Sequence, residues 1–538
     1  MKRKNLVVIM TDDQGYWTLG CAGNPDAHTP NIDRLAERGV YFENFFCVSP
    51  VCSPARASFF TGNIPSAHGV TDWLDGGNID ARKYEATQGP TYASERECID
   101  YLEGQMTFPE LLQENGYTCA LAGKWHLGNS VQAQHGFSKW FSVPLGHSPY
   151  LDPPLIENGT VYQGKGFVTD LITEKTIDYL RELGPRAKEE DAPFYISVHY
   201  TAPHSPWGKL TQPARWFDYY KDCTFDSVPF EPMHKNAIFT NESPYFAFGA
   251  EAKEPEALRQ ELLSGYFGAI AAMDEGVGEI MKELEAQGLL EDTVVVFTSD
   301  NGMNTGHHGI WGKGNGTYPQ NMYDTSVKIP FILYDRRVKD QGRVESSLYS
   351  HYDFLPTVTE LLGLKLTHEE REKMEKLPGR SFVEVSEREA YDGERGRGSV
   401  QILEEDSEKA VVVYSEYGPV RMIRTRDWKY IHCYPQGPNE LYDLKNDPGE
   451  SHNLIDDPAQ QERIWKMKYE LDRWFVDYVD PRKDATKDNN TGNGQIRKNG
   501  LDCEGKRAFT NMPSIGIPYM EAIDLMKQQL ARYIPPEE

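Results

Sequence analysis

The sequence has no long hydrophobic run. Near its start the longest apolar stretch is Leu6–Met10, and the acidic pair Asp12 and Asp13 follows after one residue. A membrane-spanning helix needs about 20 apolar residues, and the core of a secretory signal peptide needs about 7 to 15. We therefore expect no membrane partner and a cytoplasmic protein, or a periplasmic or secreted one only if a leader was removed.

Positive charge is in short supply. The 538 residues include 82 Asp and Glu but only 56 Lys and Arg, which gives a formal net charge of −26. Proteins that bind long polyanions present an excess of positive charge, so we expect no nucleic acid partner. A small anionic ligand is still compatible with this composition, because a local cluster of Lys, Arg, His and metal can hold it.

Cysteines are few and are not grouped. The eight cysteines have neither the close spacing of zinc sites nor the density of a disulfide-rich scaffold. Most of them are expected to be reduced residues of the core.

Short apolar runs alternate with stretches of helical periodicity over most of the chain. Such alternation predicts βαβ units, so we expect an α/β fold with a large mixed, mostly parallel sheet sandwiched by helices. The expected strands are 5–10, 117–122, 194–200, 293–297 and 328–334, and the expected helices are 30–38, 107–116, 167–183, 254–287 and 351–362.

Charge and composition divide the chain into three parts. Residues 1–385 form the expected catalytic domain, and short alternating strands in 386–480 predict a smaller C-terminal α+β subdomain with an antiparallel sheet. Residues 481–538 form a polar tail with a terminal helix at about 517–533. This helix is expected to pack on the body of the protein or on a second copy of the chain, as in a homo-oligomer.

Polar clusters directly follow four of the expected strands. The carboxyl ends of parallel strands meet at one edge of a sheet, where sites of α/β proteins lie. We therefore expect these side chains to converge. The clusters are Asp12-Asp13, Lys124 with His126, His204, and Asp300-Asn301.

Two of these clusters offer metal ligands. Asp12, Asp13, Asp300 and Asn301 supply oxygen atoms from two strand ends. Oxygen ligands of this kind suit Ca²⁺ or Mg²⁺ rather than Zn²⁺. Either pair alone would be read as a turn former or a helix cap, but two pairs at strand ends favour a metal.

The segment Cys52–Arg56 reads Cys-Ser-Pro-Ala-Arg and predicts the start of a helix that ends at Gly62. Pro54 suits the first turn, and the helix dipole favours an anion near Cys52. Arg56 lies one turn on and can direct its donors toward the same place. By itself the segment is explained about equally well by a buried core cysteine beside a surface arginine, and a thiolate nucleophile is a third reading.

The Cys-x-Pro-x-Arg pattern resembles the signature of the type I sulfatases. The block Gly123–Gly128, Gly-Lys-Trp-His-Leu-Gly, is also similar to a conserved block of that family, and the other motifs follow in family order. The resemblance implies an alkaline-phosphatase-like fold. It further implies that a sulfatase-maturating enzyme oxidises Cys52 to Cα-formylglycine, and that Ca²⁺ binds Asp12, Asp13, Asp300, Asn301 and the modified residue 52.

The resemblance also implies a role for each remaining site residue. One hydroxyl of the hydrated aldehyde attacks sulfur, and a base then removes the proton of the second hydroxyl so that sulfate leaves. The implied roles are charge neutralisation by Arg56, sulfate contacts by Lys124 and Lys313, base by His126, and acid toward the leaving alcohol by His204 or, in competition, His308.

We expect the substrate to be a small sulfated carbohydrate, since a cytoplasmic enzyme needs a small imported substrate. The alternatives are choline sulfate or an aryl sulfate, a phosphonate or phosphate ester, and an inactive metal-binding relative. Aromatic residues of the loops can stack on a sugar or aryl ring, although ordinary packing explains them equally well. These residues are Trp73, Trp207, Trp216 and Tyr219.

Overall fold

The computed structural model describes most of the chain between residues 3 and 509. The ranges it leaves undescribed within these limits are 84–96, 238–242, 245, 248–249, 252–253, 387–398, 404–408, 416–419, 435–436, 488–493 and 501–504. The expected terminal helix at 517–533 lies outside the described residues.

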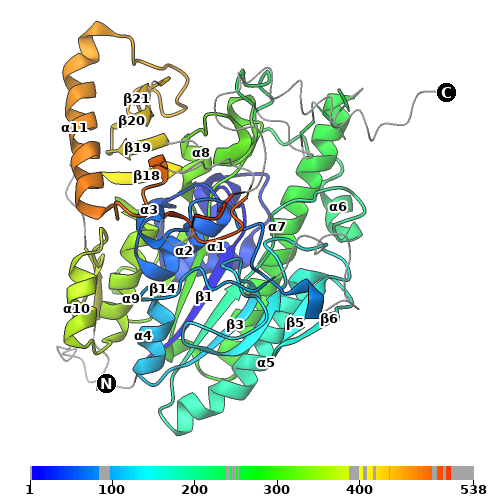
Figure 1. Cartoon of the computed structure of the whole chain (residues 1–538). Helices are drawn as coiled ribbons and strands as arrows, with labels where there is room; N and C mark the ends of the chain where they lie inside the picture. The colour runs from blue at the N-terminus through cyan, green and yellow to red at the C-terminus, as the bar shows by residue number, and fades with distance from the viewer. Residues whose placement is uncertain are drawn as a thin grey trace.

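Five parallel strands form the centre of the large sheet (Figure 1). Neighbouring pairs run in the same direction along the whole series, so the expected mostly parallel sheet is confirmed. In spatial order the strands are β10 (Thr293–Ser299), β1 (Asn5–Thr11), β7 (Phe194–His199), β3 (Thr118–Lys124) and β4 (Phe137–Val143).

Antiparallel strands extend this centre on both sides. They flank β10 and β4, and one further strand, β15 (Arg343–Ser350), runs parallel to β2. The additional strands are β14 (Phe331–Tyr334), β2 (Val40–Phe46) and β13 (Lys328–Ile329) beside β10, and β5 (Pro154–Glu157) and β6 (Thr160–Gln163) beside β4.

Strand β1 is buried on both faces, which explains its continuous apolar sequence. Leu6 and Met10 point into one hydrophobic cluster, and Val7 and Ile9 point into the other. Alternate residues of a strand face opposite sides of the sheet, and helices must therefore cover both sides.

Helices pack on the two faces of the sheet (Figure 1). The expected sandwich is confirmed. One face carries α1 (Pro30–Arg38), α5 (Val168–Glu189) and α7 (Pro255–Ala286), and the other carries α2 (Cys52–Thr61), α4 (Phe108–Glu114) and α9 (Phe354–Leu362). Shorter helices are α3 (Pro65–His68), α6 (Ala214–Tyr220), α8 (Asp324–Val327) and α10 (His368–Glu375).

A second, antiparallel sheet follows near the C-terminal end. Its order is β18 (Val411–Ser415), β19 (Val420–Arg424), β20 (Trp428–Cys433) and β21 (Glu440–Asp443), and α11 (Gln461–Tyr478) packs on it. The expected C-terminal antiparallel sheet with a packed helix is confirmed. The expected boundary at 385 falls inside β16 (Val383–Ser386), which pairs with β17 (Ser399–Ile402).

The described residues bear on two further expectations, those about membrane-spanning helices and about cysteines. No helix among them is long and apolar enough to cross a membrane. The seven described cysteines are all free, and four of them are buried as expected of core residues, whereas Cys21, Cys98 and Cys223 are not buried.

A buried charge cluster joins the second sheet to the first. Lys429 on β20 is fully buried and lies 2.6 Å from Asp324 Oδ1 and 2.5 Å from Glu450 Oε1. Glu450 also accepts a hydrogen bond from the backbone N–H of Asp324, and Arg424 pairs with the same aspartate at 3.0 Å. Asp324 begins α8 in the first domain, so these contacts hold the two sheets together.

Replacement of Lys429 tests this cluster. We expect Lys429→Met to lower the free energy of unfolding by about 3–5 kcal/mol, because two buried carboxylates lose their shared cation. Chemical unfolding of the variant and the parent protein measures the difference. Lys445→Met, at an exposed position after β21, is the control and should change little; an equal loss in both variants would contradict the assignment.

Candidate active site

Helix α2 begins at the cysteine of the signature. Val51 before it is extended, and Gly62 ends the helix in the left-handed conformation with φ of 65°. All ten residues of the helix are buried. The prediction that Cys52 lies at the start of a helix ending at Gly62 is therefore confirmed, and the helix passes through the core.

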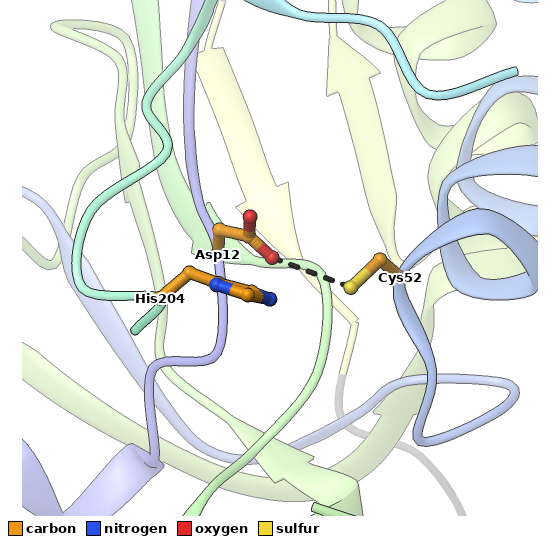
Figure 2. A group of neighbouring side chains, drawn as sticks. All are labelled: Asp12, Cys52 and His204. Carbon is orange, nitrogen blue, oxygen red and sulfur yellow. Dashed lines mark hydrogen bonds between the residues drawn. The ribbon is translucent and has the colours of Figure 1, made fainter. Parts of the chain in front are cut away.

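The thiol of Cys52 lies between charged groups, next to Asp12 and His204 (Figure 2). Lys313 Nζ is 2.8 Å from Sγ, and Sγ donates to Asp12 Oδ1 at 3.4 Å. Burial raises the pKa of this thiol to about 12, and Asp12 adds to the effect. An unmodified Cys52 is therefore neutral at physiological pH, which argues against a thiolate nucleophile.

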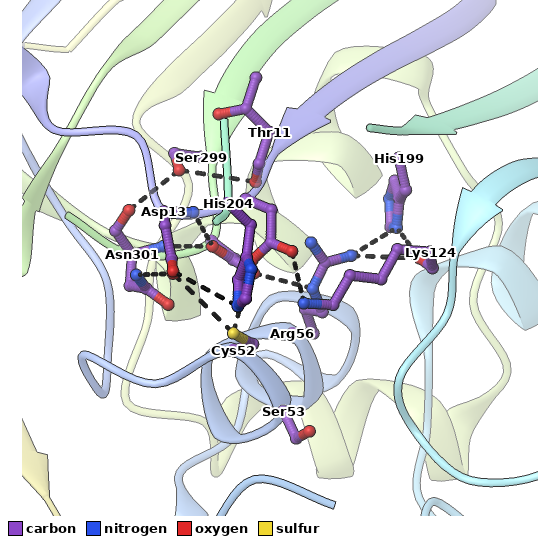
Figure 3. A network of polar contacts seen from close by, with 12 residues as sticks. Thr11, Asp13, Cys52, Ser53, Arg56, Lys124, His199, His204, Ser299 and Asn301 are labelled. Carbon is purple, nitrogen blue, oxygen red and sulfur yellow. Dashed lines mark hydrogen bonds and ion pairs between the residues drawn. The ribbon is translucent and has the colours of Figure 1, made fainter. Parts of the chain in front are cut away.

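Three buried carboxylates meet three cations beside Cys52. Figure 3 shows two of these cations, Arg56 and Lys124, in the same polar network as Asp13 and Cys52. Each carboxylate comes from the end of a central strand. Each one pairs with one cation, so the charges within each pair cancel. The pairs are Asp12 with Lys124 at 2.5 Å, Asp13 with Lys313 at 2.5 Å, and Asp300 with Arg56 at 2.9 Å. The expected convergence of strand-end side chains is thus present in the structure.

Burial and charge compete at these carboxylates. Burial acts to raise the pKa of Asp300, but Arg56, Lys124 and Lys313 outweigh it and hold that pKa below its ordinary value. At Asp12 burial dominates, and the pKa is raised even though Lys124 opposes the shift. The carboxylates therefore depend on nearby positive charge to stay ionised.

The four expected metal ligands lie together and fit a cation. Ligand oxygens of Asp12, Asp13 and Asp300 lie within 4.8 Å of one another. Among the described residues, buried Oδ1 of Asn301 has no hydrogen-bond partner, while its Nδ2 donates to Asp13 Oδ1 at 2.8 Å. A buried oxygen without a partner is costly, and an oxygen-binding cation such as Ca²⁺ would satisfy it.

His126 presents one ring nitrogen without a partner. Its Nε2 lies 3.2 Å from the carbonyl oxygen of Leu74, and its buried Nδ1 has no hydrogen-bond partner among the described residues. Burial lowers the pKa of His126 well below its usual value, and Lys124 lowers it further. With the proton on Nε2, Nδ1 is the atom that can accept a proton.

The backbone leaves the extended conformation at His126, which has φ of 55°. His126 lines the cavity beside Cys52, whereas Lys124 is fully buried and pairs with Asp12. Arg56 is likewise fully buried behind the carboxylates.

The structure separates the two candidate acids. His204 lines the cavity, and its Nε2 lies 3.6 Å from Asp13 Oδ2 while Nδ1 lies 2.8 Å from the Ser205 carbonyl oxygen. His308 does not line that cavity; its ring stacks on Tyr323 with centroids 3.7 Å apart. Only His204 is therefore positioned beside Cys52.

The cavity next to Cys52 has a volume of about 160 Å³. Of the predicted residues, Cys52, His126, His204 and Lys313 line it. The lining also includes residues from separate loops, of which the sequence singled out only Trp73. These residues are Trp73, Asp75, His147 and Asn315.

Sequence reasoning missed His199 on β7. This fully buried histidine approaches Arg56 Nη1 at 3.2 Å and the Lys124 carbonyl oxygen at 3.0 Å. It therefore contacts the guanidinium group of Arg56 and the backbone, not the ammonium group, of Lys124. In the sequence, His199 is marked only as a polar residue at the end of an apolar run. Among the expected stacking aromatics, Trp207 and Trp216 are core residues, and Tyr219 packs on His28.

A model of the family described as Sulfatase matches residues 4–364. The chain belongs to the sulfatase family. A second model, described as N-sulphoglucosamine sulphohydrolase, C-terminal, matches residues 306–476. Membership in this family makes the protein a sulfuric ester hydrolase and confirms the resemblance found in the motifs.

Individual relatives of this sulfatase resemble it over most of their length. An N-acetylglucosamine-6-O-sulfatase of Bacteroides thetaiotaomicron is 27% identical, with 88% of this chain and 87% of the relative covered. A choline-sulfatase of Rhizobium meliloti is 26% identical, with 85% and 83% covered. Another protein has been solved in complex with its substrate D-glucosamine-2-N,6-O-disulfate. Its structure matches this chain with a TM-score of 0.69 and 24% sequence identity, and the match covers 90% of this chain and 100% of that chain.

Gly146 gives a test of the position of His126. A Cβ atom at residue 146 would lie 2.1–2.4 Å from three atoms of the His126 ring, so Gly146→Ala must displace the ring. We expect sulfatase activity to fall about 100-fold, the scale of loss from a 1 Å misplacement, while circular dichroism shows a folded protein.

The matched control is Gly208→Ala. A Cβ atom there meets only Glu261 Oε1, at 3.7 Å. This variant should retain its activity, and full activity in Gly146→Ala would show that the His126 position is not needed.

Proposed function

We propose that this sulfatase hydrolyses the sulfate ester of a small sulfated carbohydrate, using formylglycine made from Cys52 and a Ca²⁺ held by Asp12, Asp13, Asp300 and Asn301. The observation that carries the proposal is the position of Cys52 Sγ, 2.8 Å from Lys313 Nζ and 3.4 Å from Asp12 Oδ1, at the edge of the cavity.

The charges of the site support an anionic substrate once a cation is present. The three carboxylates and the three cations described above cancel one another, so the protein alone offers little net attraction to sulfate. A bound Ca²⁺ would add two positive charges and polarise the sulfate oxygens. Lys313 lines the cavity, and its ammonium group can contact a sulfate placed beside residue 52.

The chain's own residues supply the proton transfers. Formylglycine at position 52 would supply the attacking hydroxyl. Nδ1 of His126 is free to take a proton, and Nε2 of His204 faces the cavity and can donate one to the leaving oxygen. The position of His308 against Tyr323 favours His204 as the acid.

The substrate assignment rests on size and on relatives. A cavity of about 160 Å³ accommodates a sulfate and part of one ring. The N-acetylglucosamine-6-O-sulfatase resemblance favours a sugar, and the choline-sulfatase resemblance keeps choline sulfate as a second candidate. Family membership favours sulfate esters over the phosphonate and phosphate esters considered from the sequence.

The modification must precede folding. Cys52 is 3% exposed and Arg56 is fully buried, so a sulfatase-maturating enzyme cannot bind this segment in the folded protein. We infer that the maturating enzyme acts on the unfolded chain.

Peptide mass tests the modification directly. From protein co-expressed with a sulfatase-maturating enzyme, the tryptic peptide 39–56 should carry an aldehyde in place of the Cys52 thiol. The same protein should release sulfate from N-acetylglucosamine 6-sulfate, with less or no release from choline sulfate and from 4-nitrophenyl phosphate. Cys52→Ala is the control and should release none; an unmodified thiol in a fully active enzyme would contradict the mechanism.

Thermal unfolding tests the metal. After chelation, added Ca²⁺ should raise the melting temperature, because a ligand that binds only the folded state stabilises it. Asn301→Ala removes the oxygen that lacks a partner and should reduce this rise at the same Ca²⁺ concentration. Asn446→Ala, an exposed amide, should leave the rise unchanged; an equal rise in Asn301→Ala would remove Asn301 from the ligand set.

A further inference from the structure

The cavity beside Cys52 is lined by two chemically different groups of residues. The buried residues Cys52 and Lys313 belong to the paired charge network of the carboxylates. The side chains of Asp75, His147 and Asn315, which are more exposed, make no hydrogen bond or ion pair with any other described residue. Polar groups that a protein leaves unpaired at a cavity are candidates for ligand contacts. We call Asp75, His147 and Asn315 the rim.

Asp75 is the acidic member of the rim. Its carboxylate is half-buried and has no cation beside it, and burial raises its pKa. An unpaired carboxylate in a partly buried position destabilises the fold. Its position in the cavity of an enzyme for anionic esters therefore needs a reason other than stability.

The loop that carries Asp75 is tied to the reaction centre. The backbone N–H of Leu74 donates to Ser53 Oγ at 3.1 Å, in the first turn of α2 next to Cys52. The carbonyl oxygen of the same residue lies 3.2 Å from Nε2 of His126. Asp75 is thus held one residue beyond a direct contact with the nucleophile helix and with the candidate base.

The tail of the chain holds the loop from the other side. Gln495 is fully buried, and its backbone N–H donates to the Trp73 carbonyl at 2.7 Å while its carbonyl accepts from Asp75 N–H at 2.9 Å. Its side chain accepts from Thr71 N–H and donates to the Gly69 carbonyl, both at 3.0 Å. These contacts fix the backbone on both sides of Trp73.

Gly494 allows the close approach of the tail. It has φ of 107°, and a Cβ atom there would lie 2.5 Å from Asp75 Cβ and 3.2 Å from the Trp73 ring. Residues 494 and 495 lie beyond the matches to both family models, which end at 364 and 476. The position of Asp75 is therefore set by a part of the chain outside these models.

We propose that Asp75 is a specificity-determining residue that accepts a hydrogen bond from a free hydroxyl of the alcohol part of the substrate, and that Gln495 is the positioning residue that holds it there. The inference rests on the proposed function and narrows it to sulfated sugars whose neighbouring hydroxyls are not sulfated. A carboxylate accepts hydrogen bonds only, so it binds a hydroxyl and repels a second sulfate or a uronic acid carboxylate. His147 and Asn315 offer further polar contacts across the cavity.

The test compares substrates that do and do not carry hydroxyls. The enzymes are the modified parent protein and Asp75→Asn, and the substrates are N-acetylglucosamine 6-sulfate, D-glucosamine-2-N,6-O-disulfate and 4-nitrophenyl sulfate, which has no hydroxyl. Asp75→Asn should lower kcat/KM for the monosulfated sugar about 10- to 100-fold, the effect of a hydrogen bond to a charged group. Its activity on 4-nitrophenyl sulfate should stay within about 3-fold, since the reaction centre is unchanged.

Further measurements separate binding from folding. The parent protein should have a higher kcat/KM for the monosulfated sugar than for the disulfated sugar. In Asp75→Asn the ratio of these two values should be smaller. The melting temperature of Asp75→Asn should be unchanged or higher, because an unpaired, partly buried charge is removed. Glu97→Gln removes an exposed carboxylate from a nearby loop outside the cavity lining and should change none of these values.

Gln495→Ala tests the positioning role, because it removes the side-chain hydrogen bonds to Thr71 and Gly69 that anchor residue 495, whose backbone holds Trp73 and Asp75. It should raise KM for the monosulfated sugar while kcat for 4-nitrophenyl sulfate is retained. Equal losses on both substrates in Asp75→Asn, or no loss on the sugar, would overturn the inference. If the modified parent protein releases sulfate from none of the three substrates, the proposed function itself fails and the inference fails with it.

Discussion

The packing of three carboxylates into a buried site is the constraint on which this structure depends. Asp12, Asp13 and Asp300 lie at the ends of β1 and β10, in the middle of the sheet, where no solvent stabilises their charge. Each must meet a cation nearby, because an unpaired buried charge costs several kcal/mol. Helix α2, the end of β3 and the loop after β12 (Trp311–Gly312) each bring one cation to them.

The same constraint connects distant parts of the chain to the site. The loop that carries Lys313 is held by Asn321, whose Nδ2 donates to the Lys313 carbonyl at 3.0 Å. Asp324 follows closely and takes part in the buried cluster with Lys429 of the second sheet. The C-terminal sheet therefore supports the placement of a cavity residue, and the tail at Gln495 supports another side of the same cavity.

Local patterns in the sequence predicted much of the fold and the charged residues around Cys52. The helix expected at 107–116, the start of α2 at Cys52 and the parallel strands at the centre of the sheet are all present. These features depend on neighbouring residues or on a short repeating period. The rim could not be predicted in this way, because Asp75 and His147 sit in loops without regular periodicity and nothing in their neighbouring residues indicates a shared cavity.

The sequence by itself determined the family, the sheet, and the carboxylates, cations and cysteine of the site, since these follow from motifs and from the rule that parallel strand ends meet at one edge. Only the tertiary structure placed His204 rather than His308 at the cavity and left Lys124 buried behind Asp12. It alone brought Gln495 to the loop of Asp75. The physical reason is that contacts between residues hundreds of positions apart depend on how the whole chain packs.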